Sequence, residues 1–251
     1  MRILIASDLH TEFHKDSGKT VFQELAKNEG VDVLVLAGDT GLIRDHSFQQ
    51  VIQYQACRLF SHVVAVLGNH EFYGSDREKV MREVSELKQK CPNFHPLEND
   101  TVTINGQRFV GCTLWFPDRP RSVMHRHGLS DFHYIKNFVG WVFTANTESQ
   151  SFLRRTLTQD DIVVTHHIPS WQGTLPYWWS QPMSDFFVCE LDTLIEEAQP
   201  KMWVYGHTHN QHDFYIGKTR LVCNPFGYLK TGETATFDWG KHIETTPLKI
   251  V

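Results

Sequence analysis

The sequence reads MRILIASDLH at residues 1–10, DVLVLAGD at residues 32–39 and HVVAVLGNHE at residues 62–71. In each stretch, a short run rich in Ile, Val or Leu is followed almost at once by Asp, Asn or His. Runs of this kind predict strands that are buried on both faces, which is typical of parallel sheets. Ligands of α/β proteins bind at the carboxyl ends of such strands. The three stretches therefore predict a ligand site that is assembled from successive strand ends.

The same patterns extend over the rest of the chain and predict an α/β fold. Further strands are expected at 101–104, 108–111, 162–165, 202–205, 214–216 and 220–223, and in the C-terminal stretch. The dipeptides Asn105-Gly106 and Gly217-Lys218 are expected to form hairpin turns. Helices are expected at 20–28, 47–60, 76–90 and 185–198. Alternation of strands with helices implies parallel pairing through right-handed crossovers.

Length, composition and charge indicate one ordinary globular domain. The chain has 251 residues, of which 41% are hydrophobic and 21% are charged. An α/β fold of this size commonly forms a single domain, so we predict one domain over residues 1–251. The net charge of −5 gives no general attraction to nucleic acid or to an anionic membrane. A small partner is therefore favoured over nucleic acid, and no membrane partner is expected.

The cysteines and the hydropathy pattern suggest a cytoplasmic protein. The five cysteines are an odd number and form no C-x-x-C motif, which favours free thiols in a reducing compartment. The apolar stretch at the N-terminus is too short for a signal peptide. No apolar run approaches the roughly 18 residues that a membrane-spanning helix needs.

Two segments have several plausible roles. Residues 114–146 fit neither the helical nor the strand period, and we interpret them as a cap-like insertion over the site. The basic residues of this segment could contact a substrate phosphate or form a solvated loop: Arg119, Arg121, His125, Arg126, His127 and His133. A following aromatic cluster could be a pocket wall, part of the core or a dimer contact: Trp171, Tyr177, Trp178 and Trp179.

Five strand ends carry side chains that commonly bind metals. The candidate ligands are Asp8, His10, Asp39, Asn69, His166, His207 and His209. Asp8 and His10 are two residues apart, and so are His207 and His209. In an extended chain, residues with this spacing point to the same side. Glycine precedes Asp39, Asn69 and His207, and it permits sharp turns or close approach of the backbone. Seven ligands of mixed imidazole and carboxylate type suit two divalent transition metals, such as Mn, Fe, Zn, Co or Ni.

The ordered set D-x-H, G-D, G-N-H-E, H and G-H-x-H resembles the calcineurin-like metallophosphoesterase superfamily. The matching residues run from Asp8 to His209, which is most of the chain. The resemblance implies a two-sheet β-sandwich flanked by helices. The implied ligands are Asp8, His10 and His209 for one metal, Asn69, His166 and His207 for the other, and Asp39 as the bridge. In the family's H-H-x-P pattern the ligand comes first, so His167 is expected to support the site by packing.

The resemblance also implies a reaction. It predicts a dinuclear metal-dependent phosphoesterase that hydrolyses a phosphate mono- or diester of a small substrate. A metal-bridging hydroxide would attack phosphorus, and His70 would be the general acid. The alternatives are a cyclic-nucleotide phosphodiesterase, a nuclease on the same site, or a non-catalytic scaffold of the same fold.

One motif departs from the protein Ser/Thr phosphatase branch of the family. In that branch G-D continues as G-D-x-V-D-R-G, and here the Asp and Arg positions hold Leu42 and Ile43. Arg44 would reach the phosphate only if the loop shifts. A different group must then orient His70, and we expect Glu71 or a backbone carbonyl to do so.

Overall fold

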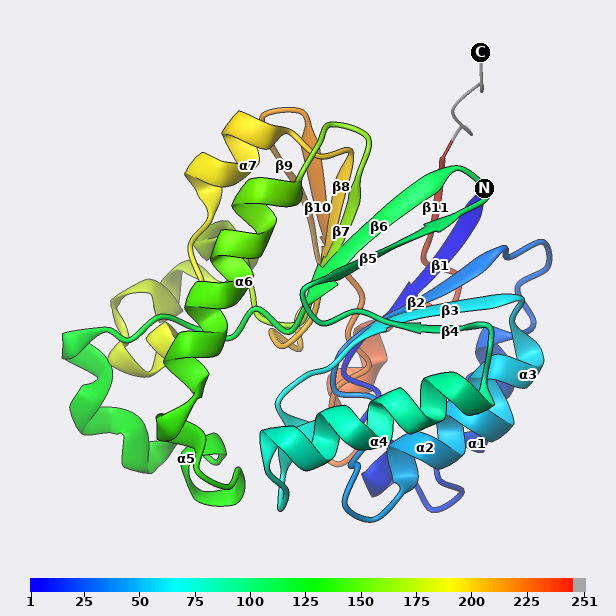
Figure 1. Ribbon diagram of the computed structural model, residues 1–251, viewed down its shortest axis with the longest axis horizontal. Helices are drawn as coiled ribbons and strands as arrows, with labels where there is room; N and C mark the ends of the chain where they lie inside the picture. The colour runs from blue at the N-terminus through cyan, green and yellow to red at the C-terminus, as the bar shows by residue number, and fades with distance from the viewer. Residues whose placement is uncertain (246–251) are drawn as a thin grey trace.

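Two β-sheets lie face to face at the centre of the structure, a computed structural model in which residues 1–245 are described (Figure 1). The first sheet has the order β11-β1-β2-β3-β4. Its strands are β1 (Arg2–Ala6), β2 (Val33–Ala37), β3 (His62–Val66), β4 (Phe94–Pro96) and β11 (His242–Glu244). The first four are parallel to one another, and β11 is antiparallel to β1. This parallel centre agrees with the strand–helix alternation of the sequence.

The second sheet contains six strands in the order β5-β6-β7-β8-β10-β9. They are β5 (Asp100–Ile104), β6 (Gln107–Cys112), β7 (Ile162–Thr165), β8 (Met202–Tyr205), β9 (His212–Ile216) and β10 (Thr219–Cys223). Its four inner strands are parallel, and a hairpin partner is added at each edge. The predicted two-sheet architecture is therefore confirmed.

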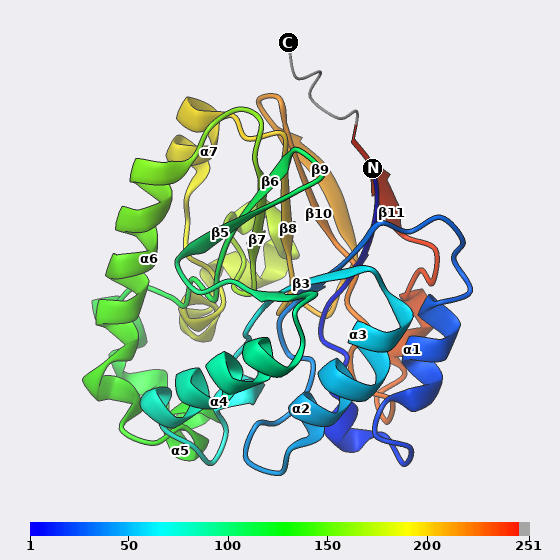
Figure 2. The same ribbon diagram turned by 45° about the vertical axis from the view of Figure 1, so that its right-hand side comes forward.

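Helices cover the outer face of each sheet (Figures 1 and 2). On the first sheet these are α1 (Lys19–Leu25), α2 (Ser47–Val51), α3 (Cys57–Leu59) and α4 (Arg77–Lys90). On the second sheet they are α6 (Val142–Thr156) and α7 (Asp192–Ala198). Side chains such as Val35, Val64 and Val164 fill the space between the sheets. Both faces of the central strands are thus buried, which explains their continuous apolar sequences.

The predicted helix at 47–60 is one helical run with a π-helical turn, Ile52–Ala56, between α2 and α3. The helix predicted at 76–90 is α4, and it begins where the Asp76 carboxylate accepts a hydrogen bond from the Lys79 N–H at 2.8 Å. An N-cap of this kind satisfies one of the backbone donors that a helix start leaves free.

The elements differ from the sequence predictions in three places. Residues 114–146, which showed no clear period, contain a 3-10 helix (Pro120–Gly128), α5 (Asp131–Tyr134) and the start of α6. Their order comes from aromatic packing, for example Phe132 against Phe138 with ring centroids 5.1 Å apart, and such packing has no simple period. The helix predicted to begin at 185 begins at Asp192, because residues 185 and 186 end a 3-10 helix (Pro182–Phe186) and Val188 then pairs with Ile168 in a parallel bridge. The short strand β4 was not predicted.

Three smaller predictions concern the termini, the thiols and the membrane. The C-terminal strand prediction is met by β11, and residues 246–251 lie outside the described part. All five cysteines are free thiols, as expected. Over residues 1–245 no helix combines the length and hydropathy needed to cross a bilayer.

Candidate metal centre

The seven candidate ligands lie together at the carboxyl ends of β1, β2, β3, β7 and β8. They form two groups of facing atoms. In the first, His10 Nε2 lies 3.2 Å from His209 Nε2, which is 3.4 Å from Asp8 Oδ1. In the second, His166 Nε2 lies 3.0 Å from Asn69 Oδ1 and 3.1 Å from His207 Nδ1. This grouping is the one that the family resemblance implies.

The Asp39 carboxylate lies between the two groups. Its Oδ2 is 3.8 Å from His10 Nε2, and its Oδ1 is 3.5 Å from His166 Nε2. One oxygen therefore faces each group, an arrangement that would allow the carboxylate to bind two ions. Asp39 is almost fully buried, so its charge is poorly screened by water.

The facing atoms of both groups are largely acceptors, and this fits a cation. His166 Nδ1 donates to the Ala37 carbonyl at 2.9 Å, and His209 Nδ1 donates to Glu233 Oε2 at 2.8 Å. In its neutral form, the form that binds a metal, each ring would present a bare Nε2 to the site, since the neutral imidazole carries one proton. Asn69 donates Nδ2 to Asp131 Oδ1 at 2.8 Å, which turns its own Oδ1 inward. Lone pairs that converge without donors suit divalent metal ions of the imidazole-binding type.

The backbone conformation of the ligand pairs differs from the prediction. Asp8 and His10 have φ angles of 53° and 46°, and His207 and His209 have 67° and 52°. These residues are therefore left-handed and not extended, so their side chains converge through tight turns of the backbone and not through the alternation of an extended strand. Non-glycine residues rarely adopt this region, and such strain gathers at functional sites.

Two glycines permit the close approach that the sequence suggested. A Cβ on Gly68 would lie 2.1 Å from Asp39 Oδ1, and a Cβ on Gly38 would lie 2.3 Å from His166 Nδ1. Both positions thus exclude any side chain, because the space is filled by candidate ligands.

Glu71 does not orient His70, which corrects the sequence expectation. Its buried carboxylate accepts hydrogen bonds from the backbone N–H groups of Gly68 and Thr40, both at 2.7 Å, and of Asp39 at 3.2 Å. Glu71 therefore ties the loop after β2 to the loop after β3. The conformations of the loops that carry Asp39 and Asn69 depend on it.

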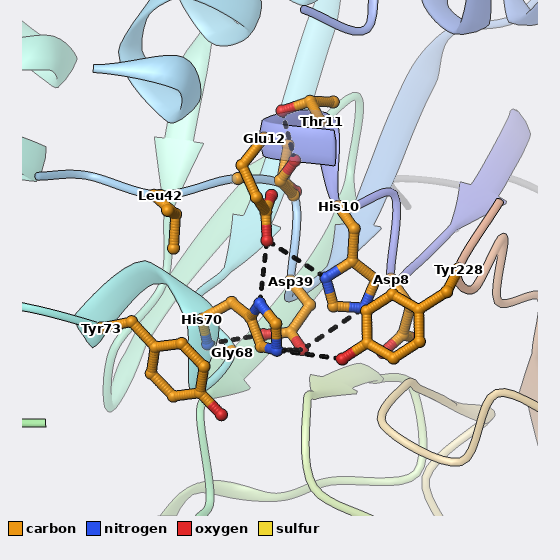
Figure 3. A network of polar contacts seen from close by, with 12 residues as sticks. Asp8, His10, Thr11, Glu12, Asp39, Leu42, Gly68, His70, Tyr73 and Tyr228 are labelled. Atoms are coloured by element: carbon orange, nitrogen blue, oxygen red, sulfur yellow. Dashed lines mark hydrogen bonds and ion pairs between the residues drawn. The ribbon is translucent and has the colours of Figure 1, made fainter. Parts of the chain in front are cut away.

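Glu12 contacts His70 in the way expected of an orienting carboxylate (Figure 3). Glu12 Oε1 lies 2.8 Å from His70 Nδ1, and the Tyr228 hydroxyl lies 3.2 Å from His70 Nε2. The sequence reasoning missed both residues. Glu12 could have been found from the sequence, since it continues the alternate spacing of Asp8 and His10 by two more positions. Tyr228 lies 158 residues from His70, and no sequence pattern connects the two.

The charges around His70 favour its protonated form. Burial favours the neutral ring, but Asp39 and Glu12 outweigh it and raise the pKa of His70 to about 9. The pKa of Glu12 falls to about 2, because the hydrogen bonds and charges of His10 and His70 outweigh its burial. In the same way, Asp8 and Glu233 raise the pKa of His209 to about 9 against the effect of burial. In the metal-free protein, the protons on His70 and His209 therefore balance part of the negative charge of the neighbouring carboxylates.

We expect the stability of the metal-free protein to fall between pH 6.5 and pH 9. A histidine whose folded pKa exceeds its unfolded value stabilises the fold fully below the unfolded pKa and loses this contribution as pH rises through the folded pKa. His70 and His209 both behave this way. In EDTA the Tm should drop by roughly 5–10 °C across this interval. Saturating Mn²⁺ should flatten the curve, and a Tm that is constant or rises in EDTA would contradict the charge assignment.

A cavity of about 310 Å³ opens above the two groups of ligands. Its lining includes His70 and Tyr228, together with Leu129, Ser130 and Asp131 of the predicted cap. Among the described residues no Lys or Arg lines it. The cavity can therefore admit a small group, but the protein side chains supply no positive charge except a protonated histidine.

The arginines of the cap are engaged away from the cavity. Arg121 forms two hydrogen bonds with Asp185, at 2.5 and 2.7 Å, and Arg126 is paired with Asp118 at 2.7 Å. Arg119 is 3.8 Å from Asp185. These contacts favour the structural alternative for the arginines, which hold the segment to the body of the protein.

His167 occupies a supporting position, as expected. Its ring packs between Trp115 and His207, with centroids 5.1 and 4.5 Å away. Burial lowers the pKa of His167 well below its usual value, so the ring is neutral. It supports His207 from behind by packing.

The comparisons with known proteins agree with this geometry. Residues 1–211 match the family model described as calcineurin-like phosphoesterase. An uncharacterized protein of Acanthamoeba polyphaga mimivirus is 28% identical over 262 residues, which cover 91% of this chain and 92% of that protein. Among solved structures, phosphopantetheinyl hydrolase from Mycobacterium tuberculosis aligns with a TM-score of 0.72 and 15% identity, covering 98% of this chain and 96% of that one.

The family match covers most of the chain and includes every strand end that carries a candidate ligand. The two mixed sheets and their flanking helices are also those of the solved relative. The chain therefore belongs to the calcineurin-like phosphoesterase family.

Proposed function

We propose that this protein hydrolyses a phosphate mono- or diester of a small molecule in the cavity above Asp39. The proposal rests on one observation: the two groups of candidate ligands meet at the Asp39 carboxylate, and His70 lies beside them. Asp8, His10 and His209 would hold one divalent transition metal, Asn69, His166 and His207 the other, and Asp39 would bind both. Two such ions supply Lewis acidity toward the phosphoryl oxygens and make water a stronger nucleophile.

The other roles in the reaction would fall to side chains of the protein. Asp39 fixes the relative position of the two ligand groups. His70 would donate the proton on Nε2 to the leaving oxygen of the ester. Glu12 holds the ring of His70 through Nδ1 and favours its charged form. Tyr228 faces Nε2 and would be displaced or shifted as the substrate enters.

A substrate screen with metal analysis tests the proposal. Protein loaded with Mn²⁺ would be offered 4-nitrophenyl phosphate, bis(4-nitrophenyl) phosphate and cyclic nucleotides. The structural likeness to phosphopantetheinyl hydrolase adds phosphopantetheinyl compounds to the panel. We expect turnover that requires metal and is abolished by chelation. A protein that carries two ions per chain and hydrolyses none of these compounds would contradict the proposal and favour a scaffold.

The alternatives receive different support from the site. The absence of Lys and Arg from the described lining of the cavity disfavours a nuclease, because phosphate-backbone binding relies on such residues. All seven candidate ligands are present and converge, and this favours an enzyme over a non-catalytic scaffold. Mono- and diesterase activity remain joint candidates that the screen separates.

Glu12→Gln should lower kcat roughly 10–100-fold on alkyl phosphate esters, the range typical of groups that orient a functional side chain. The loss should be smaller on 4-nitrophenyl phosphate, whose leaving oxygen needs little protonation. In a His70→Asn background, Glu12→Gln should lower kcat very little further, because the two residues act as a unit.

The matched control is Glu86→Gln, which changes the same residue type at an exposed position of α4. It should leave the rate unchanged. Glu12 also lies 3.4 Å from His10 Nδ1, so an effect through the metal is the competing explanation. An equal loss on both esters, accompanied by a lower metal content, would show that Glu12 acts through His10.

A further inference from the structure

A second cavity of about 500 Å³ adjoins the one above the candidate ligands. The two share three wall residues, Phe187, Thr208 and His209. A group that leaves the phosphate site past His209 would therefore enter the second cavity directly. We call this second cavity the side groove.

The surface of the side groove is mostly apolar, although Thr174, Ser184, Thr208 and Asn210 also line it. Ile168 follows β7, Trp178 belongs to the 3-10 helix Pro176–Ser180, and Met183 belongs to the 3-10 helix Pro182–Phe186. Trp178 is 45% exposed, although a free surface indole is costly to leave in water. Of the predicted aromatic cluster, Trp178 alone lines the groove, whereas Tyr177 and Trp179 are not among its lining residues. The pocket-wall alternative thus applies to one residue of the four.

The charge of the side groove selects against anions. The charged side chain among its described lining residues is Glu233, apart from His209, and no Lys or Arg is present. The Glu233 carboxylate already accepts hydrogen bonds from His209 Nδ1 and from the Tyr228 N–H, both at 2.8 Å. A second phosphate or a carboxylate on the substrate would meet this negative charge, and no Lys or Arg lines the groove to pair with it.

We propose that the side groove binds an uncharged, apolar arm of the phosphoester substrate, next to the phosphate held above Asp39. The inference rests on the proposed phosphoesterase function and narrows its substrate class. It favours esters of apolar or amphipathic alcohols over nucleotides and sugar polyphosphates, which carry further charge or many hydroxyl groups.

Binding of alkylphosphonates to the Mn²⁺-loaded protein tests the groove without any turnover. By calorimetry, Kd should fall at least tenfold from methyl- to hexylphosphonate, because each buried methylene is worth up to about fourfold in affinity. A hexyl-length arm that ends in a carboxylate should lose this gain. Equal affinities for the two alkyl arms, or no binding of either, would overturn the proposal.

Variants show whether the gain arises in the side groove. Trp178→Ala and Met183→Ala should each remove much of the preference for hexyl- over methylphosphonate and leave methylphosphonate binding unchanged. The matched control is Tyr177→Ala, since Tyr177 neighbours Trp178, is exposed and does not line the groove. A preference that survives both groove variants, or is lost equally in the control, would place the arm elsewhere.

Hydrolysis of 4-nitrophenyl methyl and hexyl phosphodiesters separates this inference from the proposed function. Turnover of both esters with equal kcat/KM would contradict the groove and leave the phosphoesterase function standing. Length-dependent phosphonate binding without turnover of any ester would support the groove and contradict the function.

Discussion

Asp39→Asn is expected to remove bound metal from both positions at once and to lower phosphoester hydrolysis at least about a thousandfold. The amide keeps one oxygen, and the Asp39 oxygen at that position, Oδ1, already accepts a hydrogen bond from the backbone N–H of His70 at 2.9 Å. Its NH₂ group would then face His10, where an acceptor is required. A rate loss of this size corresponds to several kcal/mol, which is the contribution that a catalytic metal typically makes.

Metal content and rate should be measured together for Asp39→Asn. We expect far fewer than two ions per chain after dialysis and a nearly unchanged circular dichroism spectrum, because the substitution preserves shape. Asp160→Asn is the matched control, since it makes the same change at an exposed position. Two tightly held ions per chain in the Asp39 variant would contradict the bridging assignment. Loss of one ion alone would assign Asp39 to a single metal.

The parts of the fold that could be predicted from the sequence are those with local causes. The strands at residues 162–165 and 202–205 have the predicted bounds, because burial on both faces requires unbroken apolar runs. The candidate ligands follow strands directly, so the strand predictions located them as well. Their convergence was predictable from the rule that parallel strands present their carboxyl ends at one edge.

The residues that surround His70 could not be placed by such rules. Glu12 follows two left-handed residues, and spacing alone does not give the direction of its side chain after those turns. Tyr228 reaches the site because the chain after β10 runs beside the end of β1, where Ser7 pairs with Pro225. Asp131 comes from a segment that is ordered by packing between aromatic rings. Each of these positions depends on contacts between distant residues.

His70→Asn is expected to lower kcat roughly 10²–10⁴-fold on alkyl phosphate esters, the range associated with loss of a general acid. Asparagine can still donate to Glu12, so the buried carboxylate keeps a partner, which alanine would remove. The variant should retain its metals, because His70 Nε2 is 4.0 Å from Asp39 Oδ2 and belongs to neither ligand group. The rate loss would then report on chemistry and not on metal binding.

The dependence on the leaving group gives this prediction its discriminating power. A 4-nitrophenyl ester departs with little help from a proton, so its rate should fall much less than that of an alkyl ester. A plot of log kcat against leaving-group pKa should therefore become steeper in His70→Asn. An equal loss across the series would mean that His70 positions the phosphate or the metals and that another group, with Tyr228 the nearest candidate, supplies the proton. Tyr228→Phe, introduced into the wild type and into His70→Asn, then decides between the two residues. Only loss of the true acid should change the slope of log kcat against leaving-group pKa.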